Sequence, residues 1–334
     1  AAIVYTSGTS GHSKGVMLTH KNIMANALAV HSIVEITCND RLLSILPLPH
    51  TYECTVGLVL PMSIGAQVFY LDKPPTARAL LPALTQVRPT VMLVVPLVME
   101  KLYKTNVLPK LTASRLSLFL YGIPFFRRFI NRLAGRKLRE TFGGLLRIMA
   151  IGGAPLAADA ERFLSEARFP YCIGYGMTET APLISGDGPA LTRIAAAGRP
   201  IPGVSVRIAD ANPQTGEGEI QVKGPNVMRG YYKDPERTAE VFTPDGWLRT
   251  GDLGLMSEER YIYIKGRSKN MILGPSGENI YPEEIESFFF DSPYVLEVLV
   301  YQHADKLTAR VYLDAAKLDE LLAERSMTLT RLSE

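Results

Sequence analysis

Apolar positions along the first half of the chain gather in short continuous runs that alternate with amphipathic segments. Residues 66–71, 90–95 and 146–151 are apolar runs of the length expected for buried strands. Residues 21–30 and 157–167 repeat their apolar positions at helical spacing. Because strands alternate with helices, we predict an α/β fold whose large domain layers helices on a mostly parallel sheet.

The pattern changes at about residue 198, where short β-rich runs become separated by Pro, Gly and Asn. These runs cover residues 204–208, 219–222 and 261–264. Turn residues at such intervals favour a small β-subdomain over residues 198–265.

A third pattern follows the β-rich region. Residues 282–289 have the spacing of a helix and residues 296–301 that of a strand. We therefore place a domain boundary near Lys269. It separates a large domain over residues 1–268 from the start of an α+β C-terminal domain over residues 269–334.

Residues 124–139 form a strongly amphipathic segment. One face of the predicted helix is apolar: Phe125, Phe126, Phe129, Ile130, Leu133 and Leu138. The rest is crowded with cations: Arg127, Arg128, Arg132, Arg136, Lys137 and Arg139. Amphipathic helices most commonly pack the apolar face on a core and leave the charged face in solvent. The alternative is peripheral contact with an anionic membrane surface, on which basic amphipathic helices can lie.

The composition narrows the functional classes. Of the 334 residues, 47% are hydrophobic and 21% charged, as in globular proteins with a packed core. A net charge of +3 is too small to indicate a nucleic-acid partner. The three cysteines, Cys38, Cys54 and Cys172, form neither a CxxC pair nor a cluster with zinc spacing. These features favour a protein of the reducing cytoplasm without a disulfide scaffold or a structural metal.

The longest apolar stretches do not predict a membrane span. Residues 90–99 are too few, because crossing a bilayer takes about 20 residues. Residues 56–71 contain Pro61 and two glycines, so we predict a helix that runs into a strand. The chain opens on an apolar run over residues 1–6, which predicts a short buried strand rather than a signal peptide.

The run from Thr6 to Gly15 consists of glycines and hydroxyl residues around one lysine. Glycine lets backbone N–H groups approach an anion closely, hydroxyl groups add donors, and Lys14 adds positive charge. The run is not a Walker loop, since Lys14 follows Ser13 and precedes Gly15. A glycine-rich turn without a ligand is the alternative, but the density of donors favours phosphate binding. The candidate residues are Thr6, Ser7, Gly8, Thr9, Ser10, Gly11 and Lys14.

Three further segments indicate chemistry only in combination. Residues 175–180 offer an aromatic ring, hydroxyls and the carboxylate of Glu179, which together suit a base, a phosphate and Mg²⁺; alone they would be a capped loop. Asp252 follows a glycine in a predicted turn, where it can bind a ribose diol or form an Asx turn. Residues 266–269 and 274–286 would otherwise be a linker followed by a helix.

In content, order and spacing these four segments resemble the adenylate-forming superfamily, which contains acyl-CoA synthetases, firefly luciferase and peptide-synthetase adenylation domains. The resemblance covers nearly the whole chain, and the ordered set is far more specific than any single motif. The turn Gly153-Ala154-Pro155 and a basic insertion over residues 103–139 are most similar to long-chain fatty-acyl-CoA synthetases. The resemblance therefore implies an ATP-dependent, Mg²⁺-using ligase that joins a fatty acid first to AMP and then to coenzyme A.

The resemblance also implies roles for matching residues. The loop from Thr6 to Lys14 would close over the β- and γ-phosphates of ATP, Thr178 would contact the α-phosphate, and Glu179 would hold Mg²⁺. Lys269 matches the hinge about which a mobile C-terminal domain turns between two half-reactions. The implied catalytic set is Thr6, Lys14, Thr178, Glu179 and Lys269.

The other matching positions concern the base, the ribose and the acyl group. Tyr175 would stack on adenine, with Gly152, Gly153 and Ala154 lining the base pocket, and Gly176 would also belong to the ATP/AMP-binding residues. Asp252 and Arg267 would bind the ribose hydroxyls. His50 matches a position beside the acyl pocket, and Gly277 matches one near the pantetheine tunnel.

Some features depart from the family pattern. The family loop usually has proline where Ser13 stands, which makes this loop less rigid. The family's C-terminal catalytic lysine lies in a Gly-Lys context beyond the hinge, and neither Lys306 nor Lys317 has that context. The region that usually precedes the phosphate loop is also absent. We therefore expect the natural protein to extend beyond both ends of this chain.

The implied first step needs no general base, because a carboxyl group with a reference pKa near 4 is ionised at neutral pH. Catalysis must instead neutralise charge during attack on the α-phosphorus, for which Lys14, Thr178 and a metal at Glu179 are suited. Two alternatives stay open: transfer of the acyl group to the phosphopantetheine of a carrier protein, and a non-catalytic nucleotide-binding scaffold. The intact candidate residues argue against the scaffold.

Overall fold

The computed structural model divides into two compact units. Unit 1 comprises Ala1–Thr250 and Gly254–Ile264, and unit 2 comprises Gly251–Leu253 and Lys265–Glu334. The structure describes residues 1–6, 13–72, 75–111, 114–273, 279–289, 292, 294–303, 306–315 and 317–319.

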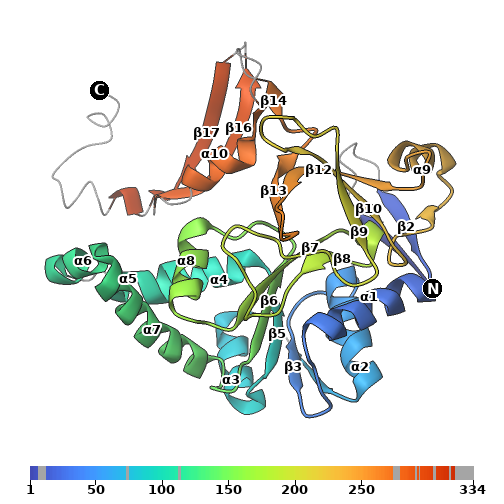
Figure 1. The fold of residues 1–334 in the computed structure, drawn as a ribbon. Coiled ribbons are helices and arrows are strands. Elements are labelled where there is room, and N and C mark those ends of the chain that lie inside the picture. The colour runs from blue at the N-terminus through green and yellow to red at the C-terminus, as the bar shows by residue number, and fades with distance from the viewer. Residues whose placement is uncertain are drawn as a thin grey trace. The chain divides into compact units, whose positions relative to one another are not determined.

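A six-stranded sheet in the order β4-β3-β5-β6-β7-β8 forms the centre of unit 1 (Figure 1). The first five strands are parallel, and β8 runs antiparallel to β7. This arrangement confirms the predicted α/β fold. The strands are β3 (Arg41–Ser44), β4 (Gln67–Tyr70), β5 (Val91–Val94), β6 (Ile148–Gly152), β7 (Tyr171–Gly176) and β8 (Leu183–Gly186).

Both faces of this sheet are covered, which explains its continuous apolar runs. All four residues of β5 are buried, and they alternate between two cores. Val91 and Leu93 pack with α1 (His20–Ile33), η1 (Glu53–Val59) and α2 (Leu60–Ile64). Met92 and Val94 pack with the other group: α3 (Ala77–Val87), α4 (Pro96–Leu102), α7 (Pro124–Thr141) and α8 (Ala158–Glu166).

The insertion between β5 and β6 is helical. After α4 it contains η2 (Tyr103–Val107), α5 (Leu108–Leu111), α6 (Arg115–Gly122) and α7. The predicted amphipathic helix is therefore present and ends two residues later than expected. Pro124 begins it, at the first helical position where a missing N–H costs nothing.

Two further sheets carry the β-rich parts of the chain. One has the order β1-β2-β11, with β1 (Ala2–Thr6), β2 (Lys14–Leu18) and β11 (Gly230–Tyr231). The other has the order β13-β12-β10-β9, with β9 (Ser205–Ala209), β10 (Gly218–Lys223), β12 (Leu248–Met256) and β13 (Ile262–Arg267). Between β11 and β12 the chain forms α9 (Pro235–Val241).

The expected burial of residues 1–6 is wrong. Ile3 is 45% and Tyr5 66% exposed, because β1 is an edge strand of its sheet and only alternate side chains face the protein.

Unit 2 contains the predicted helix and strand after Gly266. They are α10 (Pro282–Phe289) and β16 (Val295–His303), and β16 pairs antiparallel with β17 (Lys306–Leu313). A short antiparallel pair, β14 (Ile272–Leu273) and β15 (Asn279–Ile280), precedes the helix.

Candidate functional site

The carboxyl ends of β6 and β7 bring two predicted groups of site residues to the same edge of the sheet. The strands are parallel neighbours, and Gly152 lies opposite Gly174 in their register. Ala154 therefore follows one strand at the same edge where η3 (Thr178–Thr180) follows the other. Crevices outside the carboxyl ends of parallel strands are the usual ligand sites of open α/β sheets.

Gly176 ends β7 at a position that tolerates no side chain. A Cβ there would lie 2.0 Å from the carbonyl oxygen of Pro182, because the chain folds back on itself directly after the strand. Tyr175, one residue earlier, is 8% exposed and packs in an apolar cluster with Ile184 and Val222. Its stacking on adenine stays a prediction.

The carboxylate of Glu179 is buried and held by a tyrosine from a distant part of the chain. Glu179 is 8% exposed, and its Oε1 accepts a hydrogen bond of 2.8 Å from the hydroxyl of Tyr231. Burial and the neighbouring carboxylate raise the pKa of Tyr231, so its hydroxyl stays a donor. The backbone carbonyl of Glu179 is fixed as well, since it accepts from the N–H of Met228 at 2.8 Å.

The same tyrosine contacts the predicted phosphate-binding lysine. Thr6 and Lys14 are cross-strand partners at the ends of β1 and β2, and β11 pairs with β2 on its other side. This pairing places the Nζ of Lys14 5.0 Å from the ring centroid of Tyr231. Tyr231 thus joins the cation of the first motif to the carboxylate of the second.

Two buried asparagines clamp the turn that carries Glu179. Asn26 on α1 is 0% exposed and Asn226 is 1% exposed. The Nδ2 of each donates to the carbonyl oxygens of both Thr180 and Leu183, at 2.8–3.3 Å. Neither Tyr231 nor the two asparagines were predicted from the sequence. For Asn26, the available signal was an amide between the alanines of α1, four residues after Asn22.

The residues at this edge fit a magnesium ion bound through one carboxylate. Among the described residues there is no group of three or more His, Cys, Asp or Glu that would hold a metal alone. Mg²⁺ commonly takes one or two protein carboxylates and completes its shell with water and substrate phosphates. Glu179, oriented by Tyr231, suits that role.

The predicted ribose-binding pair lies in unit 2, where the two side chains meet. The Nε of Arg267 is 2.8 Å from Oδ1 of Asp252, and Asp252 is 4% exposed. The expectation that Asp252 lies in a turn is wrong, because it is inside β12. Leu248, Thr250 and Asp252 alternate with more exposed residues on one face of that strand.

The remaining predicted residues that the structure describes lie on separate elements. Lys269 is exposed in the turn after β13, and His50 is exposed in the turn before η1. The loop residues Ser7, Gly8, Thr9, Ser10 and Gly11, as well as Gly277, lie outside the described part of the chain.

An unpredicted carboxyl group lies three residues after His50. Glu53 is 1% exposed, and burial raises its pKa to about 7, although Ser44 at the end of β3 donates a hydrogen bond to it. Its Oε2 has no partner among the described residues. The ring of the preceding Tyr52 lies next to Gly152. A protonatable group is therefore buried near the carboxyl edge of the sheet.

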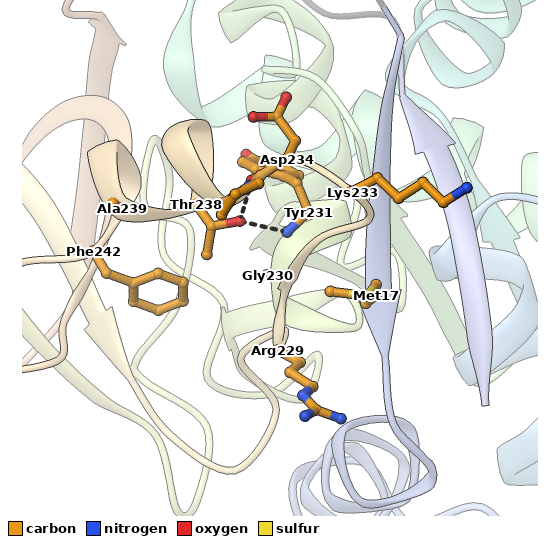
Figure 2. Close-up of a pocket in the computed structure, with 10 residues that line it drawn as sticks. Met17, Arg229, Gly230, Tyr231, Lys233, Asp234, Thr238, Ala239 and Phe242 are labelled. Carbon is orange, nitrogen blue, oxygen red and sulfur yellow. Dashed lines mark hydrogen bonds between the residues drawn. The ribbon is translucent and has the colours of Figure 1, made fainter.

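A pocket of about 460 Å³ is formed by β2, β11 and α9, and Figure 2 shows the residues that line it. At its wall, Oγ1 of Thr238 accepts from the N–H of Tyr231 and donates to the carbonyl of Asp234. Tyr231 lines this pocket, but none of the described residues that the sequence predicted for the nucleotide site does.

The comparisons with known proteins agree with the family resemblance. The sequence profile of the family described as AMP-binding enzyme matches residues 1–232. The chain is 33% identical over 330 residues to long-chain-fatty-acid–CoA ligase 1 of Homo sapiens, covering 92% of this chain and 47% of that protein. The chain thus spans about half the length of this curated relative.

Solved structures with the same fold include ligand complexes. ATP-bound MatB from Rhodopseudomonas palustris matches with a TM-score of 0.75 and 33% identity, over 94% of this chain and 58% of that one. O-succinylbenzoate coenzyme A synthetase (MenE) from Bacillus subtilis, in complex with ATP and magnesium ion, matches with a TM-score of 0.74 and 27% identity, over 97% and 63%. With the profile match over more than half of its length, the chain belongs to the AMP-binding enzyme family.

Proposed function

We propose that this protein activates a long-chain fatty acid with ATP to give acyl-AMP and pyrophosphate, and then transfers the acyl group to coenzyme A with release of AMP. One observation carries the proposal: in a chain of the AMP-binding family, Tyr231 joins Lys14 and Glu179 at one place. This arrangement provides a cation for departing phosphates and a carboxylate for a metal. The preference for a long-chain acid rests on the human relative named as such a ligase.

The chain's own residues would act mainly by binding and orientation. Lys14 and the loop before it would bind the β- and γ-phosphates. Glu179, fixed by Tyr231, would hold Mg²⁺, which would neutralise phosphate charge when bound. Thr178 would orient the α-phosphate for the carboxylate. These groups stabilise charge where it develops, which is commonly the largest contribution to such catalysis.

The second half-reaction would need a rearrangement about Lys269. The Asp252–Arg267 pair would hold the ribose while the thiol of coenzyme A displaces AMP. A boundary of domain motion at Lys269, with His50 beside the acyl group and Gly277 near the pantetheine, stays a prediction from the family pattern.

Pyrophosphate release by the protein tests the proposal, measured with a panel of acids from acetate to palmitate. We expect release that requires ATP, Mg²⁺ and a long-chain acid, and acyl-CoA when free coenzyme A is added. Release without acyl transfer to coenzyme A, but with transfer to a carrier protein, would replace the second step. No release with any acid would overturn the proposal.

A further inference from the structure

The helix α7 packs into the protein through its polar and small residues. Arg127 forms an ion pair with Glu166 on α8, with Nη2 2.8 Å from Oε1. Asn131 is 1% exposed, and its Nδ2 donates to Oε2 of the same glutamate at 2.7 Å. One turn further, a Cβ on Gly135 would lie 2.6 Å from the Cβ of Ala167. The buried stripe of α7 is therefore closely fitted to its neighbour and leaves no room for the aromatic residues.

The aromatic face of α7 points outward as a result. Phe125 is 76%, Phe129 58%, Leu133 49% and Phe126 41% exposed, and Phe119 on α6 is 68% exposed. The interpretation that this face packs on the core is therefore wrong; of the predicted apolar face, only Leu138 is buried. Exposed apolar residues gathered on one face of a helix mark an interaction surface rather than ordinary scatter.

Unpaired cations lie beside the aromatic residues. At helical spacing, Arg128, Arg132, Arg136 and Arg139 form a stripe adjacent to the one that contains Phe125 and Phe129. All four, together with Lys137, are exposed, and no ion pair of theirs is found among the described residues. The only acidic residue on α7 is Glu140.

We propose that this surface, defined by Phe125, Phe126, Phe129 and Leu133 with the five cations of α7, binds an anionic membrane. An interfacial helix buries its apolar side chains at the boundary of head groups and acyl chains, while its cations contact anionic lipids. A second copy of the chain fits poorly, because two-fold pairing through this face would bring the same cations together. Within the described residues, no helix combines the length and the apolar character needed to cross a bilayer.

Flotation of the protein with vesicles tests the proposal. With phosphatidylcholine containing phosphatidylglycerol we expect binding that falls as salt shortens the Debye length from about 10 Å at 0.1 M to about 3 Å at 1 M. Binding to pure phosphatidylcholine should be much weaker. Because each cation near such a surface contributes about five-fold in affinity, the double change Arg128→Gln with Arg132→Gln should reduce binding roughly 25-fold, whereas Lys at both positions should retain it.

The apolar contribution is tested with Phe125→Ser and Phe129→Ser together, which should weaken vesicle binding by at least about tenfold. Phe288→Ser on α10 is the matched control, since Phe288 is 73% exposed but lies on another unit. All these variants should unfold at the wild-type temperature and release pyrophosphate normally from a long-chain acid supplied without vesicles, so failure of the membrane proposal is distinguishable from failure of the proposed enzyme.

Three outcomes would overturn the proposal. If the wild-type protein does not bind anionic vesicles, or binds them independently of salt, this surface does not bind lipids as proposed. If the arginine variant loses binding to heparin and to vesicles equally, and the phenylalanine variant loses neither, the protein binds vesicles by unspecific charge attraction. Protection of Phe125 and Phe129 from covalent footprinting in the free protein shows that another segment or protein covers them.

Discussion

The hydroxyl of Tyr231 donates a 2.8 Å hydrogen bond to Oε1 of Glu179, although the two residues are 52 positions apart in the chain. A neutral donor that is buried against a carboxylate restricts where that carboxylate points. Fixing Oε1 of Glu179 in this way also fixes the direction of Oε2. A fixed direction matters for a carboxylate that is proposed to hold a metal.

Removing only this hydroxyl should impair the first half-reaction. Tyr231→Phe keeps the ring beside Lys14 but frees the carboxylate, so we expect pyrophosphate release to fall roughly 10–100-fold, the usual effect of losing a hydrogen bond to a charged group. The apparent requirement for Mg²⁺ should rise as well. Tyr232→Phe, at the neighbouring and 41% exposed tyrosine, is the control and should be neutral. A Tyr231→Phe variant with wild-type Mg²⁺ dependence would assign the hydroxyl to folding alone.

The carboxylate itself should matter more than its partner. Glu179→Gln retains the shape and can still accept from Tyr231, but it lacks the negative charge. We expect acid-dependent pyrophosphate release to fall by about 10²–10³ or more without loss of folding. The exposed Glu258→Gln serves as a control for loss of one charge. Wild-type release from Glu179→Gln would remove this residue from the metal site.

Stability should depend on pH through Glu53. Its folded pKa of about 7 exceeds the ordinary value of 4.5, so its contribution to stability is complete below pH 4.5 and is lost as pH rises through about 7. Between about pH 5 and about pH 8, the free energy of unfolding of the wild type should therefore fall by up to about 3 kcal/mol relative to that of Glu53→Gln, measured by denaturant unfolding. A constant difference between the two proteins across this range would mean that Glu53 is ionised in the folded protein.

Through Asp40, the stability of the protein should depend on pH in the opposite direction. Burial alone would raise the pKa of this carboxyl, but hydrogen bonds from Arg147 and Thr90 hold it well below its usual value. Its stabilising contribution is present at neutral pH and is lost as pH falls below about 4. Asp40→Asn should lower the free energy of unfolding at neutral pH by about 2–4 kcal/mol, with the exposed Asp72→Asn as control. Equal stability of the two variants would show that water replaces the Arg147 contact.

Continuous apolar runs predicted β4, β5 and β6, but they did not predict β3, although Leu42 and Leu43 of that strand also face the two cores. β5 and β6 were found because both faces of each strand lie in a core, which makes the whole strand apolar. β3 and β7 were not identified. β7 contains Gly174 and Gly176, which interrupt the pattern because Pro182 and Leu183 approach their backbones too closely for a side chain. The close backbone approach that shapes the site therefore requires glycines, and these glycines remove the continuous apolar run by which the strand could have been predicted.

The missed features depend on contacts between distant parts of the chain. Tyr231 reads as one more apolar residue of a β-rich region, and nothing near it in the sequence indicates Glu179 as its partner. The orientation of α7 was misjudged for a similar reason: periodicity reveals an apolar stripe, but only Glu166 and Ala167 show that the polar stripe is the one that packs. Family resemblance supplied the other site residues.

The double asparagine clamp on the Glu179 turn also has a consequence for the order of folding. Its donors, Asn26 and Asn226, are 200 positions apart, and both bind the carbonyls of Thr180 and Leu183. During synthesis the first amide emerges long before its acceptors, and the second only after the intervening strands have left the ribosome. Contacts of such separation close late, since the entropy of long loops opposes them. We therefore expect the turn to take its final form among the last events of folding, so that a nascent chain remains unable to capture nucleotide until the surrounding core is complete.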